Sequence, residues 1–128
     1  MKTLIKRLIL GLVLFSSASV SGAQAVPLAH ISSPEYYHVL LENEHVLVLK
    51  MVLQPGESDM SHRHHNETVY FPKGGQLTIT EENGESFVAN VLDGHVMGHE
   101  AWAHQVSNTG DTEVVAIIVE SKVSHHEQ

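Results

Sequence analysis

The chain has 128 residues, 15 acidic and 7 basic side chains, 11 histidines and no cysteine, and its formal charge is −8. This length predicts one small domain, and the scarcity of lysine and arginine, with no basic stripe, argues against nucleic-acid binding. The absence of cysteine excludes a disulfide framework, so the core or a bound metal must stabilise the fold.

The first 25 residues are typical of a secretory signal peptide. Lysine and arginine residues up to Arg7 precede an apolar run over residues 8–15, and small and polar residues follow as far as Ala25. The apolar run is much shorter than the roughly 20 residues that span a bilayer. We therefore expect cleavage after Ala25, a periplasmic or secreted mature chain, and no membrane attachment after cleavage.

After the signal peptide the sequence predicts an arm, one domain of short strands and a tail. Residues 26–35 contain two prolines and should form a loosely held N-terminal arm, residues 36–122 the domain, and residues 123–128 a flexible tail. Turn signals recur roughly every 8–12 residues with no sustained helical period, which predicts an all-β sandwich or barrel. The expected strands cover residues 36–41, 46–53, 60–64, 67–71, 77–80, 87–91, 95–97, 102–107 and 113–122.

Two of the expected strands are apolar on both faces. In the segment 46–53 valines share the face of Lys50, and the segment 114–119 is apolar throughout. A strand of this kind is buried on both faces by a second sheet or by a partner subunit. Because isologous packing of sheets is a common way to cover such faces, we expect a homodimer.

The most informative segment holds His62 and His64. Because side chains alternate along a strand, both imidazoles should leave the same face about 6–7 Å apart along the backbone, as two ligands of one metal require. Glu67 has the opposite parity, and a bulge or turn at residues 65–66 would bring its carboxylate beside the imidazoles. His104 is a fourth candidate, provided that its strand neighbours the first in a closed barrel.

Three more histidines lie near these candidates in the sequence. His65 points away from its neighbours, so we expect it to be exposed or to contact the ligands from behind. His95 and His99 could support the ligands, shuttle protons, form a weak metal site at the rim, or be solvated loop residues.

Strand parity also predicts an apolar wall beside the candidate ligands. Val69 and Phe71 share the parity of Glu67, whereas Trp102 and Val106 share that of His104. These four side chains should line the barrel interior, while Tyr70 should pack outside it.

The spacing of these residues resembles the two sequence motifs of the cupin family. The first consists of Gly56, five residues, His62-x-His64, two residues, Glu67, six residues and Gly74, and the second runs from Gly94 through His104 to the turn at residues 108–111. The resemblance covers roughly residues 36–120 and is strongest to small single-domain bacterial cupins. It implies a cupin jelly-roll, or double-stranded β-helix, barrel in which His62, His64, Glu67 and His104 bind one metal ion.

Three imidazoles and a carboxylate suit one divalent transition metal, which could be Fe, Mn, Ni, Cu or Zn. With open positions, the metal could bind and polarise a small oxygenated substrate. Dioxygenase, isomerase and lyase chemistry all remain open, and no catalytic residue is identified apart from the candidate ligands. The alternative is a non-catalytic periplasmic protein that binds a metal, a small ligand or a carbohydrate.

Overall fold

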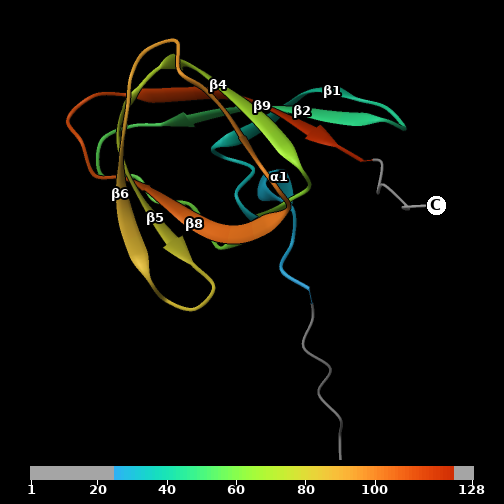
Figure 1. Cartoon of the computed structure of the whole chain (residues 1–128), viewed down its shortest axis with the longest axis horizontal. Helices are drawn as coiled ribbons and strands as arrows, with labels where there is room; N and C mark the ends of the chain where they lie inside the picture. The colour runs from blue at the N-terminus through green and yellow to red at the C-terminus, as the bar shows by residue number, and fades with distance from the viewer. Residues whose placement is uncertain (1–24, 123–128) are drawn as a thin grey trace, which may run out of the picture.

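Two antiparallel sheets face each other in the computed structural model, which describes residues 25–122 (Figure 1). Nearly all of the predicted signal peptide, residues 1–24, and the predicted tail, residues 123–128, lie outside the described residues. One sheet has the order β1 (Tyr37–Glu42), β2 (Val46–Leu53), β9 (Val114–Ser121), β4 (Glu67–Lys73) and β7 (Val96–His99). The other has the order β3 (His62–His64), β8 (Trp102–Asn108), β5 (Gly75–Glu81) and β6 (Ser86–Val91).

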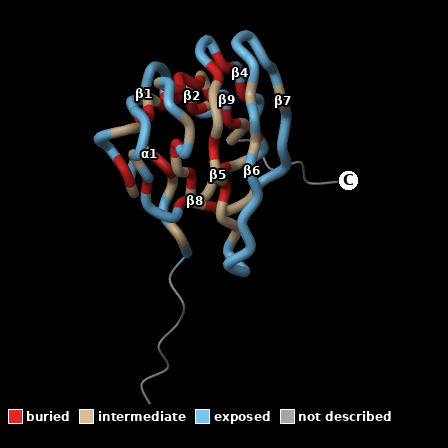
Figure 2. The backbone as a smooth tube through the Cα atoms, turned by 90° about the vertical axis from the view of Figure 1, so that its left-hand side faces the viewer, coloured by how far each residue is buried: buried red, intermediate tan, exposed pale blue. Residues whose placement is uncertain are grey.

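Strand periodicity decides which side chains fill the space between the sheets. In β2, Leu47, Leu49, Met51 and Leu53 are buried, whereas Lys50 on the opposite face is exposed. Figure 2 shows the buried residues gathered between the two sheets, with β6 and β7 mostly exposed. The predicted all-β fold is therefore confirmed, and its inner faces form a single core.

The strand order places an early and a late segment of the chain side by side. β8 pairs with β3 on one side and with β5 on the other. His104 lies directly opposite His62 in this register. The neighbouring strands on which the candidate site depends are thus present.

The expectation of a loosely held arm is wrong. Residues 29–32 form the short helix α1 (Ala29–Ser32), in which Ala29 is fully buried. Pro27 accepts a backbone hydrogen bond from Arg63 at 2.9 Å, and the Ser33 hydroxyl accepts one from the Met60 amide at 2.8 Å. β3 is an edge strand, so the arm covers polar groups that would otherwise lack partners.

The same contact shortens the strand predicted over residues 60–64, because Met60 bonds to the arm instead of to a neighbouring strand. Within residues 25–122, the structure has no helix that is long and apolar enough to cross a membrane.

Candidate metal site

Three buried imidazoles meet on the inner face of the smaller sheet. β3 supplies His62 and His64, and β8 supplies His104. These side chains are at most 5% exposed, and one ligand atom from each lies within 4.8 Å of the others. The ring centroids of His62 and His104 are 4.7 Å apart, and those of His64 and His104 are 5.2 Å apart. The predicted parity of His62 and His64 and the predicted approach of His104 are both present.

Hydrogen bonds fix the tautomers of His62 and His64. His62 Nδ1 lies 2.8 Å from the Met60 carbonyl, which can only accept, so this nitrogen carries the proton. His64 Nδ1 donates to Glu120 Oε1 at 2.5 Å. The two Nε2 atoms, 2.9 Å apart, therefore turn lone pairs toward each other when both rings are neutral.

Burial favours the neutral forms of His62 and His104. Desolvation, with a contribution from the neighbouring His64, lowers the pKa of His62 to about 4, and desolvation lowers the pKa of His104 to about 2. A second proton on the His62 ring is therefore unfavourable at neutral pH. Two nitrogens bound at about 2.1 Å and at a right angle to one metal stand roughly 3.0 Å apart, so the observed spacing fits a cation.

Glu67 reaches the site from the opposite sheet. The chain bends at residues 65–66, as predicted, and Glu67 then begins β4. Its Oε1 accepts a hydrogen bond from Trp102 Nε1 at 2.9 Å, and its Oε2 lies 3.4 Å from His64 Nδ1. Burial raises the pKa of this carboxyl. Glu67 thus lies beside His64, in a cluster with His64 and Glu120 and not in the cluster of three histidines.

Two buried polar atoms of the candidate ligands lack a partner. Among residues 25–122, neither Glu67 Oε2 nor His104 Nδ1 has a hydrogen-bond partner. An unsatisfied buried polar group costs about 1–3 kcal/mol. A carboxylate oxygen and an imidazole nitrogen without partners, together with two facing Nε2 atoms, are the kinds of donor atom that a divalent metal binds, so the residues fit such an ion.

Glu120, which sequence analysis missed, supports the site from β9. It is fully buried, and its second oxygen, Oε2, accepts hydrogen bonds from the His65 amide at 3.2 Å and from His65 Nδ1 at 2.9 Å. Burial alone would raise the pKa of Glu120, but the hydrogen bonds from His64 and His65 contribute to lowering it overall. The sequence did offer a signal for this role, because Glu120 is an acid at an inward-facing position of a largely apolar strand.

A second missed pair lies behind His62. Asp59 is buried and accepts hydrogen bonds from the Tyr37 hydroxyl at 2.6 Å and from the Val106 amide at 2.7 Å. Burial raises the pKa of Asp59 to about 6. Asp59 Oδ2 lies 3.5 Å from His62 Nδ1, so this carboxyl ties β3 to β8 and to β1 close to the metal site. Neither residue belongs to a spacing pattern that sequence reasoning could use.

The remaining three histidines have different surroundings. His65 is half-buried and contacts Glu120, which in turn holds the candidate ligand His64, so it reaches that ligand only through this carboxylate. His99 is exposed and stacks on Trp102, with ring centroids 3.8 Å apart. His95 is exposed and lies beside Phe71, with ring centroids 6.3 Å apart.

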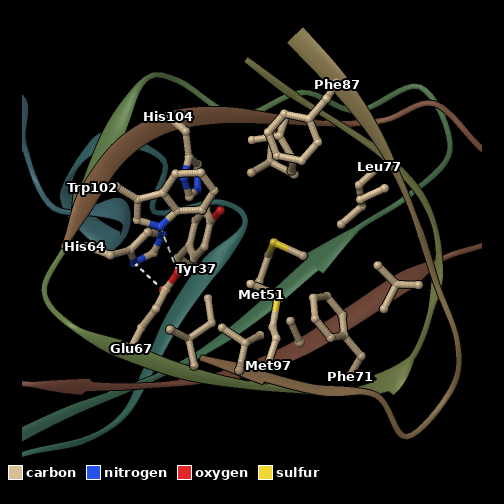
Figure 3. Close-up of a pocket in the computed structure, with 17 residues that line it drawn as sticks. Tyr37, Met51, His64, Glu67, Phe71, Leu77, Phe87, Met97, Trp102 and His104 are labelled. Carbon is tan, nitrogen blue, oxygen red and sulfur yellow. Dashed lines mark hydrogen bonds and ion pairs between the residues drawn. The ribbon is translucent and has the colours of Figure 1, made fainter. Parts of the chain in front are cut away.

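A cavity of about 110 Å³ extends from His64 and His104 into the barrel (Figure 3). The predicted wall is confirmed, because Val69, Phe71, Trp102 and Val106 all line this cavity. Tyr70 is exposed on the outside, as expected.

Several solved structures that match this chain are described as cupins. The chain is 28% identical to a cupin domain from Bordetella pertussis, covering 80% of this chain and 100% of that one, with a TM-score of 0.63. A predicted oxalate decarboxylase from Thermotoga maritima is 25% identical over 68% of this chain and 79% of that one, with a TM-score of 0.51. An RmlC-like cupin from Methanocaldococcus jannaschii, which has a double-stranded β-helix fold, is 21% identical over 66% and 77%, with a TM-score of 0.55.

No protein-family model matches the chain, and no curated protein matches its sequence. The solved structures nevertheless show that the chain has the cupin, double-stranded β-helix fold that its two motifs predict.

Proposed function

We propose that this protein holds one divalent transition metal through His62, His64 and His104, with Glu67 as the fourth ligand, and uses it to bind and polarise a small oxygenated molecule. The observation that carries the proposal is the pair of Nε2 atoms 2.9 Å apart on two buried imidazoles whose Nδ1 atoms already have acceptors. Fe, Mn, Ni, Cu and Zn all accept this donor set.

The chain's own residues give the site its chemistry. Met60 and Glu120 hold the Nδ1 protons of His62 and His64, so both rings present Nε2 to the ion. Trp102 orients the Glu67 carboxylate through Oε1 and leaves Oε2 free. The largely apolar wall lowers the local dielectric constant and so strengthens electrostatic interactions in the cavity. A bound metal with open positions would supply Lewis acidity.

An exogenous ligand tests whether the metal keeps an open position. Cobalt(II)-loaded protein should change its visible absorption spectrum when azide is added, because azide would occupy a free coordination site. The exposed-residue variant His38→Ala should respond in the same way. A cobalt spectrum that azide leaves unchanged would indicate a closed structural site and would contradict the proposal.

A non-catalytic binding protein is the second candidate. It is favoured by the state of two polar groups in the cavity wall: the Tyr37 hydroxyl is bonded to Asp59 and the Trp102 indole to Glu67. Neither group is free to act as a proton donor. A ligand that raises the melting temperature of the metal-loaded protein without yielding product would support this candidate, whereas turnover that is lost in His62→Ala would support an enzyme.

We also propose that the protein forms a homodimer through the outer face of its larger sheet. Paired positions across β1, β2 and β9 place Leu41, Val48 and Val119 in one row, and Tyr70 lies beside Val96 in the next. Four of these five side chains are exposed, and Val48 is half-buried. An apolar patch of this kind is typical of an interaction site.

Light scattering at micromolar concentration should give the mass of two chains for the wild type and of one chain for Val119→Asp. Val88→Asp, an equivalent change on the other sheet, should remain dimeric. A monomeric wild type would contradict the dimer.

Export is a further proposal and rests on the sequence of residues 1–25. The full chain expressed in a bacterium should be recovered from the periplasm or the medium with Val26 as its first residue. Intact mass measurement checks this, and an unprocessed cytoplasmic chain would contradict it.

A further inference from the structure

We propose that the cavity selects small neutral molecules that carry their oxygen atoms at one end and an apolar body, about the size of one ring, at the other. This inference rests on the proposed metal site and names the class of molecule that the site would take.

The polar and apolar side chains of the cavity are segregated. Figure 3 shows His64, Glu67, Trp102 and His104 together at one end. Met51, Phe71, Leu77 and Met97 lie farther from this group, and Phe87 also contributes to the wall. A bound molecule would therefore meet polar groups at the metal end and carbon or sulfur along the rest of its length.

The polar groups at that end have no hydrogen bond to spare outside the metal site. Tyr37 donates its hydroxyl proton to Asp59, and Trp102 donates its indole proton to Glu67. Among the described residues, neither lysine nor arginine lines the cavity. The metal would accordingly provide the polar recognition, and a second charged group on the ligand would have no counter-charge in the wall.

The size of the cavity and the cost of desolvating hydroxyl groups disfavour a carbohydrate ligand. A cavity of about 110 Å³ is comparable with engineered apolar cavities of about 150 Å³ that stay dry and bind benzene. A sugar would bury several hydroxyl groups without partners, which is unfavourable. The geometry thus disfavours the carbohydrate ligand that sequence analysis left open.

A set of hydroxamic acids tests this selectivity, because its members share one chelating head. Calorimetric titration of the metal-loaded protein should show benzohydroxamic acid binding at least about 10-fold more tightly than acetohydroxamic acid, since the ring buries more apolar surface. 4-Carboxybenzohydroxamic acid, with a charge at the far end, should bind at least about 10-fold more weakly than benzohydroxamic acid. Glucose should not bind.

Two variants test whether the preference for the ring compound arises in the cavity. Ala89→Leu enlarges a cavity-lining side chain on β6 and should abolish the preference for the ring, with metal affinity unchanged. Val88→Leu changes the next residue, which is exposed and is not part of the wall, and should keep the preference. Equal binding of the three hydroxamic acids, or a ring preference that survives Ala89→Leu, would overturn the inference.

Separate measurements distinguish failure of the inference from failure of the proposed function. Metal content and affinity are measured first for each protein, and absence of metal binding would refute the metal site. The metal-free protein is then tested with toluene, which should raise its melting temperature but not that of Ala89→Leu. Lack of a toluene shift in the wild type would refute the apolar binding cavity, whatever the metal result.

Discussion

The Nε2 atoms of His62 and His64 face each other at 2.9 Å inside the barrel, and the Nδ1 atom of each ring already has an acceptor. His62 Nδ1 already carries its proton and burial opposes a second one, so His62 Nε2 turns a lone pair toward His64. A metal ion held by both Nε2 atoms at about 2.1 Å, to one side of the line that joins them, would satisfy both nitrogens. This relationship is the basis for proposing a metal site. The carboxylates around the site have separate roles, and each can be tested by itself.

Replacing Glu120 by glutamine should weaken metal binding by about 10–100-fold. The amide oxygen can still accept the proton of His64 Nδ1, but the negative charge is lost and the amide nitrogen faces donors on His65. Calorimetry measures the affinity, with the exposed hairpin variant Glu82→Gln as the matched control. Wild-type affinity in Glu120→Gln would show that this carboxylate does not tune the site.

Replacing Glu67 by glutamine separates a metal ligand from a support for Trp102. Glutamine keeps an oxygen acceptor for the indole but loses the carboxylate, so metal affinity should fall by about 10-fold or more while the fluorescence of the metal-free protein stays unchanged. Trp102 is the only tryptophan in the chain, so the emission reports on the surroundings of this one side chain, which include the Glu67 contact. Unchanged metal affinity would mean that Glu67 serves only to hold Trp102.

Asp59 and Tyr37 should contribute to stability and not directly to metal chemistry. Asp59→Ala leaves the buried Val106 amide and the Tyr37 hydroxyl without their acceptor, so the free energy of unfolding should fall by about 2–4 kcal/mol. Tyr37→Phe should cost about 1 kcal/mol, and the double variant should lose less than the sum. Urea unfolding of the metal-free protein measures these changes, and additive losses would contradict a shared bond.

The metal-free protein should lose stability as the pH falls from 6.5 to 4. The pKa of His62 is lowered to about 4 and that of His104 to about 2, so in this range the unfolded chain binds more protons than the folded one. The raised pKa values of Asp59 and Glu67 act in the opposite sense and offset part of the loss.

The net loss should be on the order of 2–4 kcal/mol. Urea unfolding at several pH values measures it, and His104→Gln should flatten the dependence. A wild-type stability that does not change between pH 6.5 and 4 would contradict the assigned protonation states.

The two-residue period of β-strands explains why much of the site was predictable. It places His62 and His64 on one face and gives His104, Trp102 and Val106 a common direction, whatever the rest of the fold. The role of Glu120 depends on β9 crossing behind β3, which is a long-range relationship that no local pattern encodes.

The burial of the arm likewise depends on long-range contacts. Its polar, proline-containing sequence is typical of a free terminus, but β3 is an edge strand whose backbone groups need partners. Sequence reasoning identified the strand and could not show that the arm would cover its edge.

Metal titration of the purified, metal-stripped protein tests the central claim most directly. Binding can be followed by calorimetry and by the emission of Trp102, whose ring centroid lies 3.9 Å from that of His104. The account predicts one divalent ion per chain, with affinity reduced at least about 100-fold in His62→Ala and in His104→Ala and unchanged in His38→Ala. Absence of binding, or binding that His62→Ala leaves intact, would contradict it.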